Sequence, residues 1–483
     1  MKLAGLDIGT TGCKCTVFDE SGRRLDRAYR EYPATHTASL HEIDARALLS
    51  GVFAAIREMA AKYPDIGGVG VTSFGETFVM TDEAGDPLHT AMLYTDPRGA
   101  EECGALADAL GEDKIVRITG LVPHEMYTVG KIMWIKAHHP TVFAAAKHIF
   151  LMEDFVVYRL TGKAQIDYSL ASRTMAFDIE RLAWSDPILN AAGVDPALLS
   201  KPVPTGTPAG TVKATADTGL SASCVVVSVA HDQLAAAVGA GAFDGSVAVD
   251  GAGTVSCFTP VFDALPDRTV LARSRVAAVP YVIPGKYVAY AFSYTGGSLL
   301  AWCVDTFGAG LSHADLEKQC ADEPTGLLVL PHFAGAATPY MDSGSRGAIL
   351  GLTTATTLPT LYRACMEGVV YEMRLNFDAL ADSGMHPTVL HATGGGAKSK
   401  CWMQMKADIL GLPVISLETE DAGTVGCAML TGVAVGVYAD LADAAAKMVR
   451  PVGEYLPRPD KHEKYMAVYE RYRGVYRAVR PLM

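Results

Sequence analysis

Several features that mark other protein classes are missing from this chain of 483 residues. No run of five lysines or arginines occurs and the formal net charge is −12, which argues against nonspecific binding to nucleic acid. No apolar stretch approaches about 18 uninterrupted residues, so no membrane-spanning helix is expected. The N-terminus also lacks a basic segment followed by an apolar one, and we therefore predict no secretory signal peptide.

The ten cysteines are scattered, mostly inside apolar segments, and no two of them form a C-x-x-C pair. This spacing argues against both a zinc site and a disulfide framework. We therefore expect buried free thiols in a reducing compartment, which predicts a cytoplasmic location.

Three widespread active-site motifs are absent as well. The chain has no G-x-x-x-x-G-K-[ST], no G-x-G-x-x-G and no G-x-S-x-G. The first absence argues against a P-loop, the second against the dinucleotide site of a Rossmann oxidoreductase, and the third against a serine hydrolase with a nucleophile elbow.

Predicted strands and helices alternate along the chain, in which 49% of the residues are hydrophobic and 19% are charged. This alternation predicts an α/β protein, and the length predicts two or three domains. The segment 1–20 has the pattern of two strands around a glycine turn, and 245–263 repeats its order of strand, acid, glycine-threonine turn and strand. We therefore predict a duplication, with domains over 1–244 and 245–483 and a cleft between them.

Three glycine-containing elements could hold phosphate groups. They are DIGTTG (7–12) with Lys14 following, DGAGT (250–254), and TGGGAKS (393–399), which follows a strand and opens a helix. Glycines let backbone N–H groups approach phosphate oxygens, and hydroxyls, a lysine or a helix N-terminus add to the attraction. Any one of them alone could be an ordinary turn or helix cap. Three in one chain, two of them at duplicated positions, favour phosphate binding.

Asp232 stands where a short β-branched strand, VVVSVA (225–230), gives way to a predicted helix. The ordinary interpretation is a helix N-cap, which contributes about 1 kcal/mol. The functional interpretation is a carboxylate that is kept ionised by the helix N-terminus and accepts a proton in the cleft. The two interpretations are compatible. The adjacent His231 has no second His or Cys at ligand spacing, so we expect it to pack or orient rather than to bind a metal.

A group of polar residues follows predicted strands in the first half of the chain: Glu76, Asp96, Arg98, Lys131, Trp134 and Asp167. Paired charges on such loops suit a polyhydroxylated ligand, which needs many directional hydrogen bonds. The alternative is a set of surface salt bridges, and for Lys131 and Asp167 that alternative stays open.

Six segments, in order and over most of the chain, resemble the FGGY family of carbohydrate kinases. They are GLDIGTTGCKCTVFD (5–19), MYTVGKIMWIKAHH (126–139), TGKAQIDYSLASRTMAFDIERLAWSDPIL (161–189), HDQ (231–233), RGAILGLTTATTLPTLYRACMEGVVYE (346–372) and ATGGGAKSKCWMQMKADILGLPV (392–414). The resemblance implies duplicated actin/hexokinase/Hsp70-like domains, of the ribonuclease H-like type. It also implies a phosphotransferase that acts on an alcohol group.

The resemblance further implies roles for individual residues. Asp232 would be the catalytic base, and Asp7 and Asp232 would serve Mg²⁺, Asp7 through water. The implied ATP-binding residues are Thr10, Thr11, Lys14, Gly253, Thr254, Gly395, Gly396, Ala397 and Ser399. The implied substrate-binding residues are Glu76, Tyr94, Asp96, Arg98 and Asp232. The expected partners are ATP, Mg²⁺ and a small sugar, without nucleic acid or membrane, and the family is compatible with a homodimer.

The identity of the sugar follows less directly. Xylulokinases usually carry Met-His, and glycerol kinases Arg-Glu, where this chain has Gly75-Glu76. The family's W-x-D-x-R appears here as YTDPR (94–98). The overall layout of the chain favours a ketopentose such as xylulose. The alternatives are glycerol, ribulose, erythritol or a deoxyketohexulose and, outside the class, a non-catalytic actin-like ATP-binding switch.

Overall fold

The computed structural model describes residues 1–37, 40–419 and 421–483, which form two compact units. The first unit contains Met1–Gly239, Ala278–Tyr287 and Asp421–Val449, and the second contains Ala240–Ala277, Val288–Glu420 and Arg450–Met483. Residues 421–449 therefore pack within the first unit, although the sequence places them in the second half. The functional domains predicted over 1–244 and 245–483 stay a prediction, because compactness alone assigns no function.

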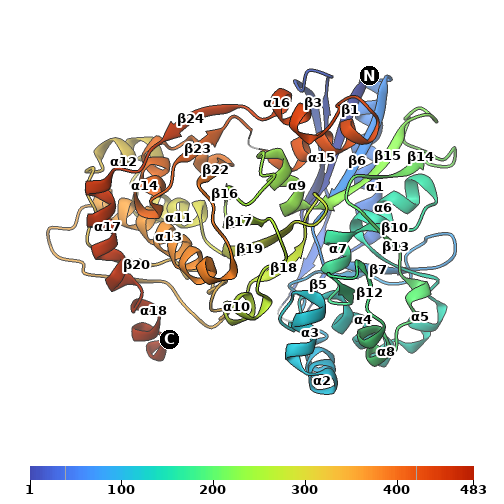
Figure 1. The fold of residues 1–483 in the computed structure, drawn as a ribbon, viewed down its shortest axis with the longest axis horizontal. Coiled ribbons are helices and arrows are strands. Elements are labelled where there is room, and N and C mark those ends of the chain that lie inside the picture. Colours follow the sequence, from blue (N-terminus) through green and yellow to red (C-terminus); the bar gives the residue numbers. More distant parts are fainter. Residues whose placement is uncertain (38–39, 420) are drawn as a thin grey trace. The chain divides into compact units, whose positions relative to one another are not determined.

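The first unit is built on a six-stranded sheet with the order β14-β15-β6-β1-β2-β3 (Figure 1). Its strands are β1 (Lys2–Ile8), β2 (Gly12–Phe18), β3 (Arg24–Glu31), β6 (Ile66–Ser73), β14 (Thr207–Thr211) and β15 (Val225–His231). Strands β1 and β2 form an antiparallel hairpin, whereas β1, β6 and β15 run parallel. The carboxyl ends of three parallel strands thus share one edge of the sheet. Asp7 lies near the end of β1, Asp232 directly after β15, and Glu76 three residues after β6.

Alternate residues of β1 face different helices. Leu6 belongs to a buried core together with residues of α1 (Ala45–Lys62). Its neighbour Gly5 faces α15 (Ala422–Ala434), where an added Cβ would lie 2.4 Å from the carbonyl oxygen of Thr424. The two-residue period of a strand explains this alternation. The side of β1 that carries Asp7 is therefore the side covered by α15.

Helix α15 also packs against α9 (Asp232–Gly239), and small residues make this contact possible. A Cβ on Gly426 would lie 1.9 Å from the carbonyl oxygen of Ala235, and one on Gly239 would lie 2.0 Å from that of Ala422. No side chain fits at such distances. The runs of alanine and glycine in both segments therefore reflect close packing of two helices beside the sheet edge.

The second unit repeats this topology. Six strands of its sheet follow the order β19-β17-β16-β22-β23-β24. They are β16 (Val247–Ala252), β17 (Ser256–Phe262), β19 (Tyr287–Ser293), β22 (Val389–Thr393), β23 (Val414–Leu417) and β24 (Pro451–Tyr455). Again an antiparallel hairpin, β16–β17, is followed by parallel neighbours, β22 and β23. The predicted α/β fold and its duplication are confirmed.

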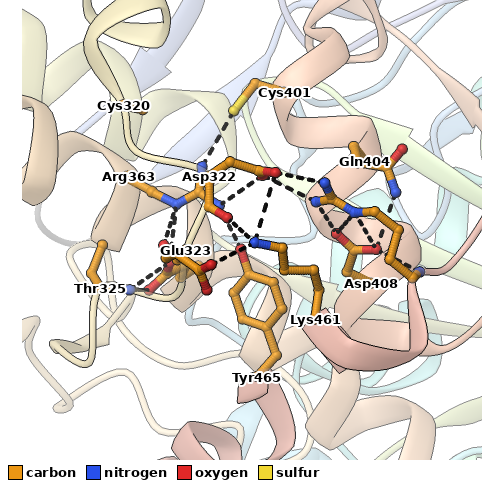
Figure 2. Close-up of polar contacts among 12 residues, drawn as sticks. Cys320, Asp322, Glu323, Thr325, Arg363, Cys401, Gln404, Asp408, Lys461 and Tyr465 are labelled. Atoms are coloured by element: carbon orange, nitrogen blue, oxygen red, sulfur yellow. Dashed lines mark hydrogen bonds and ion pairs between the residues drawn. The ribbon is translucent and has the colours of Figure 1, made fainter. Parts of the chain in front are cut away.

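A network of charged side chains joins three helices of the second unit (Figure 2). These helices are α13 (Leu358–Leu380), α14 (Lys400–Leu410) and α17 (Pro459–Tyr472). Arg363 on α13 donates to the Tyr465 hydroxyl on α17 over 2.6 Å and to the Cys401 sulfur on α14 over 3.6 Å. The network therefore ties α17 to α13 and α14.

Two expectations about composition can be compared with the structure. All ten cysteines are free, and eight of them are buried, which confirms the prediction of free thiols. No helix in the described part of the chain combines the length and the apolar character that a membrane crossing needs.

Candidate active site

The first predicted phosphate hairpin joins β1 to β2 by a tight turn. The N–H of Gly9 donates to the carbonyl of Gly12 over 2.9 Å, and the hydroxyl of Tyr32 donates to the carbonyl of Gly9. Thr10 is half-buried and Thr11 is exposed at the tip. The turn is thus anchored at Gly9 with Thr11 exposed at its tip, and its predicted role in phosphate binding stays a prediction.

Lys14 lies between two carboxylates beside this hairpin. Its Nζ is 3.5 Å from Asp7 Oδ2 and 3.3 Å from Asp421 Oδ1. Burial alone would lower the pKa of Lys14, but the two carboxylates outweigh it and raise that pKa. Burial raises the pKa of Asp7, which Lys14 opposes and Asp421 reinforces. The ammonium group of Lys14 is therefore held beside the hairpin by one carboxylate from the N-terminal part of the chain and one from the C-terminal part.

Asp421 is a residue that sequence reasoning missed. It precedes α15, and Nη1 of Arg27 on β3 lies 4.0 Å from its Oδ2. No local pattern connects it to Lys14, because 407 positions separate the two residues. Only the packing of α15 within the first unit brings them together.

Asp232 is the first residue of α9 and directly follows the buried strand β15. Its side chain is 32% exposed, yet Oδ1 is buried and receives no hydrogen bond from any described residue. Nε2 of His231 lies 3.2 Å from that atom. Burial, with smaller contributions from the charges of Asp7 and Glu76, raises the pKa of Asp232 to about 8. At a pKa of about 8 the carboxyl is mostly protonated at pH 7, contrary to the expectation that the helix N-terminus keeps it ionised, and it becomes a competent proton acceptor as the pH approaches that value.

Few side chains at this site could bind a metal ion. Among the described residues, no three His, Cys, Asp or Glu side chains are grouped closely enough to hold a metal ion by themselves. The carboxylates of Asp7 and Asp232 are nevertheless partly exposed and electrostatically coupled. One or two carboxylates suit Mg²⁺, which keeps several waters and is completed by substrate phosphates. The residues present therefore fit a magnesium ion that arrives with a nucleotide.

Glu76 follows β6 in an unusual backbone conformation and in a buried ion pair. Its φ of 61° lies in the left-handed region, where a non-glycine residue is strained. Its Oε1 accepts from Nε of Arg173 over 2.6 Å, and both side chains are buried. Burial raises the pKa of Glu76, and the charge of Arg173 opposes that rise. Arg173 lies within a recognised segment, but sequence reasoning gave it no role.

Asp96 and Arg98 form an inward-facing pair. Asp96 has no exposed surface, and its carboxylate accepts from the His41 N–H over 2.8 Å and from Nε of Arg98 over 2.8 Å. Although burial acts in the opposite direction, these bonds lower the pKa of Asp96. The guanidinium of Arg98 also lies 5.0 Å from the ring of Trp134. The pair shapes this loop, and its predicted contact with substrate stays a prediction.

Three further residues singled out from the sequence, Lys131, Asp167 and Tyr94, also lie in the first unit. Lys131 is fully buried and donates to the carbonyl oxygens of Asp96 and Arg98, so it forms no surface salt bridge. Burial lowers the pKa of Lys131 to about 8. Asp167 is also buried and caps the helix α7 (Tyr168–Ser172). Tyr94 is half-buried against the core of the first unit, and its predicted role in substrate binding is not decided by this placement.

In the second unit the hairpin β16–β17 carries Gly253 and Thr254. Their carbonyl oxygens accept from the N–H groups of Gly297 and Gly296, each over 2.9 Å. This glycine pair opens α11 (Gly297–Phe307) and was also missed. The signal available in the sequence was TGGS (295–298), a glycine pair directly before an apolar helical run.

The third glycine element lies beside the same hairpin. Gly394 has a φ of 89°, and a Cβ there would lie 2.8 Å from the carbonyl oxygen of Ala252. Gly395 has open space where its Cβ would be, Gly396 lies against Trp402, and Ala397 is buried. Ser399 caps α14 by accepting from the Trp402 N–H over 3.1 Å. The structure thus brings the two predicted nucleotide elements of this unit together, with Gly395 facing outward.

The comparisons with known proteins decide the family. Residues 3–239 match the N-terminal domain of the FGGY family of carbohydrate kinases, and residues 252–435 match its C-terminal domain. The chain belongs to this family. Its xylulose kinase relative from Bacillus subtilis (strain 168) is 26% identical over 482 residues, which cover 98% of this chain and 96% of that protein. A glycerol kinase from Delftia acidovorans is 30% identical over 497 residues, covering 97% of each chain.

The solved structures agree on the fold of this FGGY kinase. The crystal structure of xylulose kinase from Rhodospirillum rubrum matches with a TM-score of 0.91 at 24% identity, covering 100% of this chain and 99% of that one. The predicted actin/hexokinase-like fold is therefore confirmed. As an FGGY family member the protein is a carbohydrate kinase, and ATP is the phosphoryl donor that a kinase of this family implies.

Proposed function

We propose that this FGGY kinase phosphorylates a hydroxyl of a neutral ketopentose, with xylulose as the first candidate and Asp232 as the base. The observation that carries the proposal is the position of Asp232, at the end of a parallel strand with a pKa of about 8. The xylulose kinase relatives support the choice of sugar because they match the chain over nearly its whole length.

The proposed mechanism assigns each group a distinct task. Asp232 accepts the proton of the sugar hydroxyl while that oxygen forms a bond to the terminal phosphorus of ATP, and the bond from this phosphorus to the ADP oxygen breaks, so that ADP leaves. Thr10, Thr11 and Lys14 hold phosphate oxygens in place at the first hairpin. A magnesium ion bound with ATP would add charge neutralisation, and Asp7 and Asp232 are the carboxylates that would hold it, Asp7 through water. Positioning and charge therefore supply most of the rate.

The second unit would hold the nucleotide. The proposed residues are Gly253, Thr254, Gly395, Gly396, Ala397 and Ser399. Their support is the close approach of the hairpin β16–β17 to the third glycine element and the open space at Gly395. Gly296 and Gly297 join them on the same geometric ground, because their N–H groups bond to the hairpin.

Glycerol or another small polyol is the second candidate acceptor. Glu76 is the residue type that glycerol kinases usually carry at this position, and the Delftia acidovorans glycerol kinase is 30% identical to this chain. Ribulose, erythritol and a deoxyketohexulose belong to the same set of alternatives. A non-catalytic ATP-binding switch is disfavoured because Asp232 and Glu76 are both in place. A cytoplasmic location and a homodimer stay predictions.

The test is a screen of ATP consumption against a panel of acceptors, with a control that contains no acceptor. The panel contains D-xylulose, L-xylulose, D-ribulose, L-ribulose, glycerol, erythritol, L-fuculose and L-rhamnulose. We expect one ketopentose to raise ADP production far above the control. Stimulation by glycerol or erythritol alone would select the second candidate. Equal ADP production with every acceptor and with none would contradict the proposed reaction.

A further inference from the structure

Strand β15, which ends directly before Asp232, is irregular over its last residues. In its pairing with the parallel strand β6, Ser228 lies opposite Val71. The next pair is His231 with Ser73. Three steps along β15 therefore match only two steps along β6, so β15 contains one extra residue, a β-bulge. A bulge bends its strand and changes the direction of the side chains beside it, and bulges are frequent next to active sites.

Two side-chain hydroxyls bind the backbone of this bulge. The N–H of His231 donates to Oγ of Ser169 on α7 over 2.9 Å, and the hydroxyl of Thr72 on β6 donates to the carbonyl of Ala230. The side chains of Ser169 and Thr72 are fully buried. A buried backbone group without a partner costs about as much free energy as a lost hydrogen bond. The two hydroxyls thus supply partners where the bulge disrupts the pairing of the strands.

The Ser169 hydroxyl is free to accept from His231 because its own hydrogen is used elsewhere. A serine hydroxyl has one O–H donor and two acceptor lone pairs. It donates here to Oδ1 of Asp167 over 3.0 Å. The same carboxylate accepts from the N–H groups of Ser169 over 2.8 Å and Leu170 over 3.0 Å, and from the Thr205 hydroxyl over 2.7 Å. Asp167 thus fixes the direction of the Ser169 hydroxyl.

The ordinary interpretation of Asp167 is that it caps α7. A cap accounts for the bonds from the N–H groups of Ser169 and Leu170. It does not account for the bond between the Ser169 hydroxyl and β15, which joins residues 62 positions apart. A chain of hydrogen bonds therefore runs from a fully buried carboxylate, through one hydroxyl, to the backbone directly before Asp232.

The helix that follows Asp232 is packed too closely to compensate for a shift of the strand. A Cβ on Gly239 of α9 would lie 2.0 Å from the carbonyl oxygen of Ala422, so the two helix backbones are in direct contact. Close packing of this kind does not deform continuously. The direction in which the Asp232 side chain leaves the end of β15 therefore depends on the shape of the bulge.

We propose that the hydroxyls of Ser169 and Thr72 position the base, because they hold the bulge that directs Asp232. Asp167 contributes by holding Ser169. This inference rests on the proposed function. The two hydroxyls act through the backbone and not on the reacting atoms. A misplacement of about 1 Å can lower a rate about 10²-fold. Loss of either hydroxyl should therefore lower kcat, whereas ATP and the acceptor should still bind.

The test compares Ser169→Ala with a matched control, Ser172→Ala. Ser172 is also a fully buried residue of α7, and its hydroxyl donates to the carbonyl of Tyr168 within the same helix over 2.7 Å. For Ser169→Ala we expect kcat to fall about 10- to 100-fold with little change in the KM values for ATP and the acceptor. The control should keep a kcat close to that of the wild type. Ser169→Thr restores a hydroxyl and should recover turnover.

A double-variant cycle separates positioning from a merely structural role. If Ser169 acts through Asp232, its hydroxyl has no effect on turnover once the carboxylate is gone. Asp232→Asn/Ser169→Ala should then have the same residual turnover as Asp232→Asn, whereas the effects of independent residues would multiply. A further loss of about 10-fold or more in the double variant, as for independent sites, would overturn the inference.

The outcomes distinguish the inference from the proposed function. If Asp232→Asn keeps the turnover of the wild type, the proposed function fails. If Asp232→Asn is inactive but Ser169→Ala and Thr72→Val both keep the wild-type kcat, the inference alone is overturned. Amide hydrogen exchange at His231 in the wild type needs no variant, in case the substitutions prevent folding. Exchange as fast as in an unprotected amide would mean that Ser169 does not hold the bulge, and slow exchange is expected.

Discussion

Asp250 and Lys406 form an ion pair with no exposed side-chain surface in the second unit. Nζ of Lys406 also lies 4.5 Å from the ring of Trp402. Asp250 occupies the place in β16 that Asp7 occupies in β1, but the side chain of Asp7 is 16% exposed and that of its partner Lys14 is 35% exposed. The two copies of the hairpin have therefore diverged: one acid is neutralised inside the protein, and the other remains available to a ligand.

From this difference we predict that loss of the Asp250–Lys406 pair lowers the stability of the protein without a specific effect on its use of Mg²⁺. Lys406→Met leaves the Asp250 charge buried without its cation, and we expect a loss of about 3–5 kcal/mol in the free energy of unfolding. Urea unfolding followed by fluorescence measures it. The double variant Asp250→Asn/Lys406→Met should recover part of the loss, since it removes both charges. A single variant as stable as the wild type would contradict the importance of the pair.

A second prediction concerns Asp421 and the ammonium group of Lys14 at the first hairpin. Asp421→Asn removes one of the two carboxylates that hold Lys14, and both partners are partly exposed. We therefore expect a modest rise in the KM for MgATP, about 2- to 5-fold, with the acceptor KM unchanged. Asp443→Asn is the matched control, because Asp443 pairs with Lys447 on α16 (Leu441–Met448). An equal effect of both substitutions would argue against a role for Asp421.

The pKa of Asp232 predicts the pH dependence of the reaction. The base must be ionised to accept a proton, and its pKa in the free protein is about 8. The value of kcat/KM should therefore rise with pH up to about 8 and level off above it. Rates measured from pH 6 to pH 10 with a saturating nucleotide would check this. A profile that is flat below pH 8 would exclude a group of this pKa as the base.

The same shift has a consequence for stability. A carboxyl whose pKa is higher in the folded state than in the unfolded chain stabilises the fold at low pH, and this contribution is lost as pH rises through the folded-state pKa. Asp232→Asn cannot ionise, so it should unfold at a higher temperature than the wild type at pH 9. Below pH 3.8, the ordinary pKa of an aspartate, the carboxyl is protonated in both states and the two proteins should unfold at similar temperatures. A lower unfolding temperature for Asp232→Asn than for the wild type at pH 9 would mean that burial does not destabilise the ionised form of Asp232.

The hairpins and the strand ends could be predicted from the sequence because local patterns encode them. DIGTTG needs only a glycine turn between two strands, and Asp232 needs only the change from a buried strand to a helix. The duplicated order of strands followed from the same patterns. These features depend on residues that are neighbours in the chain.

The partners of these residues could not be predicted in the same way. Arg173 meets Glu76 across 97 positions, and Asp421 meets Lys14 across 407. No short motif records such contacts. The placement of 421–449 in the first unit depends on the fit of Gly426 against α9, which is a property of packing. Sequence patterns gave the proposed catalytic group, whereas the charges that adjust it came only from the tertiary structure.

The most direct test of the account is the acceptor-dependent production of ADP by Asp232→Asn, measured beside the wild type with the best acceptor from the panel. The substitution keeps the size of the side chain and removes its basicity. Nucleotide binding and thermal unfolding should show that the variant is folded, and Asp217→Asn, at a surface ion pair with Arg57, is the control. We expect turnover to fall about 10²- to 10⁴-fold with nucleotide binding retained. Turnover equal to that of the wild type would contradict the assignment of Asp232 as the base.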